Sequence, residues 1–362
     1  MKDVFRDLFQ SFKKASYKKK FLLSIFLLIY MLVLISVLIK VNYQVTTPGA
    51  ITSTVSTTAD PKDYWVIKIQ EENLAGNINT VGIYNHKRIS YFQYLISKLS
   101  PRVKISDYDP KTMLSEEEDV VRGVLQKDYS IIDALIVAYE AASLKDSSIH
   151  IEYKFQGLLV MAVMKHSESN LLPGDLIKSI NGQSFKNIDE FRTILSSLTE
   201  GEFPMIVIRE KEEVEISSKM VFLEEQGYKL GVELHEKIEI DKNLTKPAYI
   251  INPNLSSIGS SGGAMMALAV YNALTEGDLT KGKVIIGTIN LDGSIGEIGG
   301  TAQKIATASM YGADIFIVGK ENYDEAYATY IQMKDLFKPN FKLIQAKNFQ
   351  EMITLLEALN ED

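Results

Sequence analysis

The stretch "IGSSGGAMMALAVYNAL", residues 258–274, places two serines and three glycines directly before a long apolar run. Such a run predicts a helix that is buried on nearly all sides, with its N-terminus inside the protein. One interpretation is structural, because a hydroxyl can satisfy free amide groups and glycine permits close packing there. The other is chemical, because a serine at that point meets the positive end of the helix dipole, which suits a developing oxyanion.

A second stretch, "IGEIGGTAQKIATA" at residues 295–308, sets Lys304 among small and apolar residues at the start of another predicted helix. Burial lowers the pKa of a lysine, and a neutral amine can take a proton from a serine hydroxyl. A solvated helix lysine is the commoner case for any single lysine. The residues alone therefore leave open whether Lys304 is catalytic and whether Ser260 or Ser261 is the nucleophile.

The first strong pattern from the N-terminus is "FLLSIFLLIYMLVLISVLI", residues 21–39, which has no charged residue and nearly the length that a membrane-spanning helix needs. We expect a transmembrane helix over residues 21–40. Residues 1–20 carry seven basic and two acidic side chains, so this segment is expected in the cytoplasm and everything after the helix outside the cell. A cleaved signal peptide is the alternative, but no Ala-x-Ala cleavage pattern follows.

Composition excludes several functions. The 362 residues include no cysteine, which rules out disulfides, thiol nucleophiles and cysteine-built zinc sites, and the four histidines lack metal-ligand spacing. No metal or other cofactor is therefore expected. The net charge is −7, and residues 1–20 carry +5, so the rest carries −12, which argues against nucleic acid. "GDLTKGK" (277–283) fits part of a P-loop, but Val284 follows where magnesium binding needs Ser or Thr, so no nucleotide is expected.

The order of predicted elements indicates a layered α/β domain with an insertion. After a short linker, "QVTTPGA", strands are expected at 64–69 and 77–84, with helices at 91–99 and 130–142. Residues 146–217 differ, because strands, an Asn181-Gly182 hairpin turn and one helix predict a small, partly open β-barrel. The expected domains are one α/β domain made of residues 45–145 and 218–362, with the 146–217 module inserted between its parts.

The inserted module resembles a PDZ domain. The likeness lies in Gly157, Leu158, Leu159 and Val160, which stand where that family has its carboxylate-binding loop, and in "LLPGDLIKSINGQ". It implies that a peptide end binds in a groove between the strand at 158–163 and the helix at 188–198. A module that only stiffens the protein or blocks access is the alternative.

The segment from Gly259 to Gly263 resembles the Gly-Pro-Ser-Ala-Gly nucleophile motif of Lon-type serine proteases, and "GSIGEIGGTAQK" resembles the hairpin before that family's catalytic lysine. The 43-residue spacing also fits, so the resemblance implies a Ser261–Lys304 dyad. Ser260 replaces the motif's proline and Gly262 its alanine, which keeps Ser260 open as a competing nucleophile. Ile286 stands where many relatives have threonine, and Thr288 is the expected substitute.

The whole arrangement resembles the PDZ-containing Lon-like serine proteases of Gram-positive bacteria, the SepM and YlbL type. It implies a membrane-anchored endopeptidase that cleaves extracellular peptides or unfolded protein segments. No counterpart of the Lon ATPase is recognised in the chain, so we expect ATP independence. The alternative is a non-catalytic peptide-binding scaffold that acts through the PDZ groove. Ring assembly is known in the Lon family, and the oligomeric state is left open.

Overall fold

The computed structural model describes residues 10, 13, 16–54, 66–69, 77–198, 201–224, 227–252, 259–276, 278–280, 283–285 and 287–359. Most of the basic segment 1–20, and Ile286, lie outside these residues. The chain divides into two compact units, one formed by Met1–Val45 with Asn85–Asp109 and the other by Thr46–Tyr84 with Pro110–Asp362. Each unit is described by itself.

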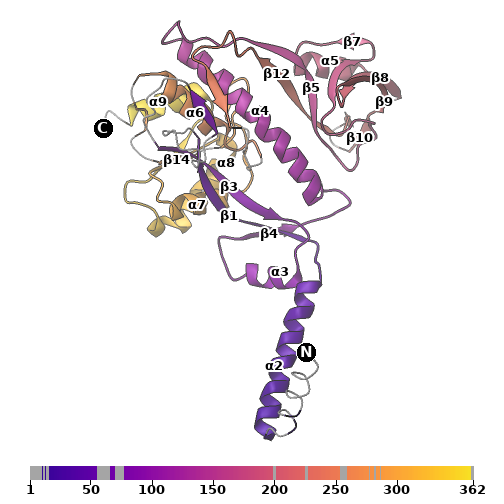
Figure 1. The fold of residues 1–362 in the computed structure, drawn as a ribbon, viewed down its shortest axis with the longest axis vertical. Helices are drawn as coiled ribbons and strands as arrows, with labels where there is room; N and C mark the ends of the chain where they lie inside the picture. Colours follow the sequence, from indigo (N-terminus) through magenta and orange to yellow (C-terminus); the bar gives the residue numbers. More distant parts are fainter. Residues whose placement is uncertain are drawn as a thin grey trace. The chain divides into compact units, whose positions relative to one another are not determined.

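The first unit contains the apolar helix predicted at the N-terminal end. Helix α2 (Tyr17–Leu38) has no buried side chain, and it is long and apolar enough to cross a membrane (Figure 1). After it, Val41 N–H donates to the carbonyl of Ile89. Helix α3 (Tyr91–Ser97) begins at a capping box formed by Ser90 and Gln93, and β4 (Lys104–Asp107) pairs with β1 (Tyr43–Ser53). The predicted apolar helix is thus confirmed, and its side chains are consistent with a membrane span or signal anchor.

The second unit contains a mostly parallel sheet in the order β16-β15-β14-β3-β1. Its strands are β16 (Lys342–Gln345), β15 (Ile315–Val318), β14 (Lys283–Ile285), β3 (Asn77–His86) and the rest of β1. The strand predicted at 77–84 is confirmed. The linker prediction for "QVTTPGA" is wrong, because this segment belongs to β1. Pairing with β3 outweighs the Pro-Gly turn signal, and a Cβ at Gly49 would overlap the carbonyl of Gly82, so glycine is what permits this approach.

Helices cover both faces of this sheet. One core joins α4 (Glu116–Ser143), α6 (Gly263–Leu274) and α9 (Phe349–Ala358) with Ile317, and a separate core joins α7 (Thr301–Met310) and α8 (Lys320–Gln332) with Phe316 and Val318. Successive strand residues point to opposite faces, so the two cores lie on opposite sides of β15. This is the layered α/β arrangement that the sequence predicts.

Helix α4 is longer than the predicted helix at 130–142, because it begins at Glu116. Ser115 and Glu118 form a capping box at its start, and four carboxylates occupy its first turn. The acidic segment before residue 130 is therefore the N-terminal half of the same helix. Figure 1 shows its length, and it packs against two strands of a second sheet, β5 (Tyr153–Val163) and β12 (Val232–Ile240).

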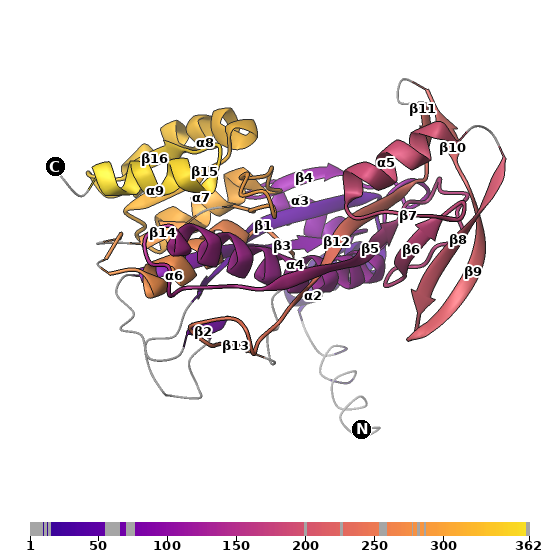
Figure 2. The same cartoon turned by 90° about the horizontal axis from the view of Figure 1, so that it is seen from above.

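The second sheet has the order β12-β5-β6-β8-β9, with β7 (Gln183–Ser184) paired to β6 (Leu176–Ile180). The other strands are β5 (Tyr153–Val163), β8 (Glu202–Arg209), β9 (Glu212–Lys219) and β12 (Val232–Ile240), and helix α5 spans Ile188–Ser197. Asn181 and Gly182 both have positive φ, as the predicted hairpin turn requires. Figure 2 shows the strands from above.

The predicted barrel is wrong, because this sheet stays open. Strands β9 and β12 stand at its two ends and do not pair with each other among the described residues. Instead, α5 side chains help to close the core of the module through Phe191 and half-buried Ile194. Strand β9 continues past residue 217, the predicted end of the inserted module, and β12 of the same sheet lies after that residue. The domain boundary at 217 stays a prediction.

The remaining elements are short. A two-stranded hairpin joins β10 (Val221–Leu223) to β11 (Gly227–Lys229), and β2 (Ile67–Ile69) pairs with β13 (Tyr249–Ile251). Strand β2 confirms the second half of the strand predicted at 64–69, whose first two residues lie outside the described part. A 3-10 turn, η1 (Lys334–Leu336), follows α8.

Candidate active site

Ser261 is half-buried and lies two residues before α6, in which all twelve residues are buried. The segment that carries it is tied to α4. Ser130 Oγ donates to the carbonyl of Ser260 over 3.1 Å, and Gly259 N–H donates to the carbonyl of Gly123 over 2.7 Å. The sequence prediction of a buried helix that begins at a serine-glycine segment is therefore confirmed.

The two glycines after Ser261 are required by close packing. A Cβ at Gly262 would lie 2.6 Å from Thr80 Cγ2 of β3, and one at Gly263 would lie 2.6 Å from Ser130 Oγ of α4. Both distances are too short for an ordinary contact. The replacement of the motif's alanine by Gly262 thus has a local reason, since alanine would collide with Thr80.

Lys304 lies in the first turn of α7 and is only 2% exposed. Burial lowers the pKa of its amine to about 8. Its side chain makes no hydrogen bond or ion pair with any residue that the structure describes. Burial without a paired carboxylate among the described residues favours the neutral amine. The alternative of a solvated helix lysine is therefore excluded.

The structure does not bring Ser261 and Lys304 into hydrogen-bond contact. Both helix starts pack on β3, because Gly262 is placed against Thr80 and Gly300 against Ile83. However, α6 shares its core with Ile78 and α7 shares its core with Val81, so the two helices pack on opposite faces of that strand. Two other residues singled out in the sequence, Thr288 and Ser260, both line one cavity of the protein.

That cavity has a volume of about 160 Å³ and lies beside the segment that carries the candidate nucleophile. Its walls come from α4, β5, β12, the segment before α6 and the segment after β14. The lining residues are Gln126, Ser130, Asp133, Met161, Glu233, Leu234, His235, Ser260, Thr288, Ile289 and Asn290.

A buried acid and a histidine face each other in this cavity, and no local pattern in the sequence indicates them. His235 Nε2 lies 3.2 Å from Asp133 Oδ2, and the Asp133 side chain is 3% exposed. Burial raises the pKa of Asp133, although His235 opposes this shift. Burial alone would lower the pKa of His235, but Asp133, Glu236 and Glu233 together outweigh it, and the net shift is upward. The two residues are 102 positions apart, so only the fold shows that they meet.

The four residues predicted for peptide binding, Gly157 to Val160, lie in a central strand. On one side Leu158 and Leu159 pair with Ile177 and Leu176 of β6, and on the other they pair with Glu236 and His235 of β12. Both edges of β5 are thus occupied at this point, and no edge is free for an added peptide strand. A Cβ at Gly157 would overlap the Ile177 carbonyl, so this glycine has a structural reason.

The edge of this sheet near α5 belongs to β12, and no strand among the described residues pairs with its outer side. Strand β12 ends the sheet order, and Glu236 Oε1 accepts a hydrogen bond from Ile188 N–H at the start of α5 over 2.7 Å. Half-buried apolar side chains of both elements pack on the module's core: Val232, Leu234, Ile194 and Leu195. A strand edge beside a helix with partly exposed apolar side chains is the geometry that strand addition requires.

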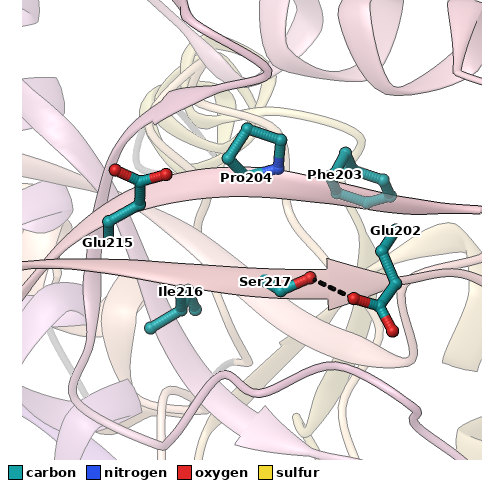
Figure 3. Close-up of a pocket in the computed structure, with 6 residues that line it drawn as sticks. All are labelled: Glu202, Phe203, Pro204, Glu215, Ile216 and Ser217. Atoms are coloured by element: carbon teal, nitrogen blue, oxygen red, sulfur yellow. Dashed lines mark hydrogen bonds between the residues drawn. The ribbon is translucent and has the colours of Figure 1, made fainter.

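A larger hollow, of about 310 Å³, lies at the opposite end of the same sheet, on β8 and β9 (Figure 3). In it, Ser217 Oγ donates to the Glu202 carboxylate over 2.7 Å, and Glu215 stands apart from this pair. None of the candidate catalytic or peptide-binding residues lines it. No group of three or more metal-ligating side chains occurs in the described part of the chain.

Comparisons with known proteins find a protease family for the C-terminal part of the chain. Residues 208–359 match the family model of the Lon protease (S16) C-terminal proteolytic domain, and this segment includes both Ser261 and Lys304. The match indicates that this part of the chain is a protease domain. No curated protein matches the chain.

Two similar solved structures are PDZ domains of SdrC-like proteins. The domain from Listeria innocua is 28% identical and covers 22% of this chain and 94% of its own, with a TM-score of 0.21. The domain from Listeria monocytogenes is 26% identical and covers 22% of this chain and 86% of its own, with a TM-score of 0.20.

Proposed function

We propose that this protein is a membrane-anchored serine endopeptidase of the PDZ-containing Lon-like type, with a Ser261–Lys304 dyad, which acts without ATP on extracellular peptides or unfolded segments. One observation carries the proposal: within a segment that matches a Lon proteolytic domain, Lys304 is buried, no described residue pairs with its amine, and its pKa is lowered to about 8. Such a lysine suits a general base near neutral pH.

In the proposed reaction, Ser261 Oγ attacks the scissile carbonyl carbon while Lys304 Nζ takes the hydroxyl proton. N–H groups at the start of α6 stabilise the oxyanion of the tetrahedral intermediate. The protonated lysine then gives its proton to the leaving amine, and water hydrolyses the acyl-enzyme by the same route. The proposal requires Ser261 Oγ to come within hydrogen-bond reach of Lys304 Nζ in the substrate complex. Catalytic hydrogen bonds are often formed only there.

The N-terminal helix supports the membrane part of the proposal. Helix α2 spans 22 residues and has no charged side chain from Phe21 onward, and the basic residues of the segment 1–20 favour a cytoplasmic N-terminus by the positive-inside rule. The protease and PDZ-like parts would then lie outside the cell, where no nucleotide drives unfolding. Substrates would therefore be peptides or segments that are already unfolded.

We further propose that peptide ends bind along the free edge of β12, beside α5, and not at Gly157 to Val160. The paired edges of β5 and the half-buried apolar side chains Val232, Leu234 and Ile194 support this position. A peptide added to β12 would lie on the strand whose other residues, Glu233 and His235, line the cavity beside Ser260. The PDZ-like module would thus position substrate close to the candidate nucleophile.

The test uses the full-length protein in detergent micelles with a library of unstructured peptides, a metal chelator and no ATP. New peptide termini are identified by mass spectrometry. We expect cleavage by the wild type, loss of at least a thousandfold in Ser261→Ala, and retained cleavage in the matched control Ser260→Ala. Undiminished cleavage by Ser261→Ala would contradict the assigned nucleophile.

A non-catalytic peptide-binding scaffold is the second candidate. It is favoured by one observation, the packing of α6 and α7 on opposite faces of β3, which leaves Ser261 and Lys304 without a hydrogen bond between them. In that case the wild type would bind peptides of the library and yield no new termini.

A further inference from the structure

The cavity beside Ser260 contains a buried carboxylate oxygen with no partner. Asp133 is 3% exposed, and its Oδ2 lies 3.2 Å from His235 Nε2. Its other oxygen, Oδ1, is fully buried and accepts no hydrogen bond from the described residues. An unsatisfied buried oxygen of this kind costs about 1–3 kcal/mol, and more when it is charged. Its presence in the wall of a cavity points to a donor that arrives from outside.

The other acidic group in the cavity already has its partners. Glu233 accepts from Arg122 Nε over 2.6 Å and from Gln126 Nε2 over 2.6 Å. Ser130 is also engaged, because its hydroxyl donates to the carbonyl of Ser260. Asp133 Oδ1 is therefore the acceptor that the cavity leaves unused among these groups.

The charge around Asp133 and His235 is mainly negative. Besides Asp133 itself, Glu233, Glu236 and Asp292 act on this pair, while Arg122 is tied to Glu233. His235, whose ring packs 5.5 Å from that of Tyr129, is the other group able to carry positive charge there. An entering cation thus meets a favourable field. The apolar part of the lining, Met161, Leu234 and Ile289, suits the methylene groups of a long side chain.

We propose that this cavity is a substrate subsite that takes the cationic side chain of a lysine or arginine in an extended peptide. The side-chain nitrogen donates to Asp133 Oδ1, and the aliphatic stem packs on Met161, Leu234 and Ile289. The volume of about 160 Å³ accommodates one such side chain. This inference rests on the proposed function, because it names the substrate class of the same site.

The experiment compares peptides in which each position around a cleaved bond carries either lysine or norleucine, a neutral residue with a similar stem. For each pair, kcat/KM is measured with the full-length protein in micelles. We expect the wild type to prefer lysine at one position by about tenfold or more. In Asp133→Asn this ratio should fall to about one, whereas Asp128→Asn, an exposed residue of the same helix, should keep it.

Because each ratio is taken within one variant, a general loss of folding or activity does not imitate the expected result. Absence of a lysine preference at every position in the wild type would overturn the subsite without reference to any variant. A preference that survives in Asp133→Asn would overturn it as well.

A binding measurement separates failure of the subsite from failure of the proposed protease. Fluorescein-labelled alanine-serine peptides with one central lysine or norleucine are titrated into Ser261→Ala protein, and their anisotropy is recorded. If no peptide is cleaved by the wild type but the lysine peptide binds about tenfold more tightly, with the difference lost on adding Asp133→Asn, the subsite stands and the protease proposal fails. Equal affinities for the two peptides would overturn the subsite.

Discussion

The starts of α6 and α7 and the paired strands β5 and β12 both contain residues singled out by the sequence, but burial has opposite meanings in the two regions. Lys304 is a buried amine without a described partner, a situation that destabilises the fold and suits chemistry. Leu158 and Val160 of β5 are buried apolar side chains in a strand that has a neighbouring strand on each side, which is what stability alone requires. Burial therefore indicates function only where it leaves a polar group unsatisfied.

The contrast between these two kinds of burial is tested most strongly by Lys304→Met, which keeps a long side chain and removes the amine. Cleavage should fall by about a thousandfold because the general base is lost. Below pH 8 the folded protein charges Lys304 in a buried site, so the variant should be more stable at pH 7 by up to about 3 kcal/mol. Peptide cleavage and urea unfolding measure the two effects. A destabilised variant would show that Lys304 has a partner in the folded protein.

Gly157→Ala should have the opposite effect to Lys304→Met, because it should lower the stability of the fold. It should have no specific effect on peptide binding. Gly157 has φ of +140°, and a Cβ there would overlap the Ile177 carbonyl, so we expect a loss of about 2–3 kcal/mol in the free energy of unfolding. Gly201→Ala is the matched control, since Gly201 has φ of +130° with open space around it. Equal losses in the two variants would mean that backbone strain, and not collision with β6, sets the effect.

The pH dependence of cleavage tests whether Lys304 is the general base. With a pKa of about 8, Lys304 is mostly protonated at pH 7 and mostly neutral at pH 9, so kcat should rise by about tenfold across this interval. Stability should also rise with pH between about 8 and the ordinary lysine pKa of about 10.5, because only the unfolded chain is still protonated there. Stopped assays in buffers of constant ionic strength measure the profile. A flat profile would contradict Lys304 as the base.

Local signals in the sequence were sufficient for most individual elements. The buried α6, the Asn181-Gly182 turn and the apolar α2 all depend on residues close together in the chain, and all three are present. The barrel prediction failed because it depended on which strands pair. The residues Gly157 to Val160 of β5 do not show that β12, more than 70 residues later, occupies the edge of that strand.

In the candidate site, too, local residue patterns are visible in the sequence and tertiary packing is not. The residue types at Ser261 and Lys304 and the 43-residue spacing are legible in the sequence, but the spacing does not show that α6 and α7 pack on different faces of β3. Asp133 and His235 lack any local pattern, since one lies in the middle of an amphipathic helix and the other in a strand between two glutamates. Only tertiary packing brings them to one cavity.

The smallest expected effect concerns peptide binding at the edge of β12. Ile194→Glu places a charge among the half-buried apolar side chains where α5 faces β12, and should weaken binding of an unstructured peptide by about tenfold. Arg192→Glu, on the exposed side of the same helix, should change affinity little, although it reverses a charge that pairs with Asp189 at 3.1 Å. Anisotropy titrations with Ser261→Ala protein remove the complication of cleavage, and thermal melts show that both variants fold. Equal affinity in the two variants would show that the peptide does not bind beside α5. Binding at the β12 edge would then have no side-chain evidence.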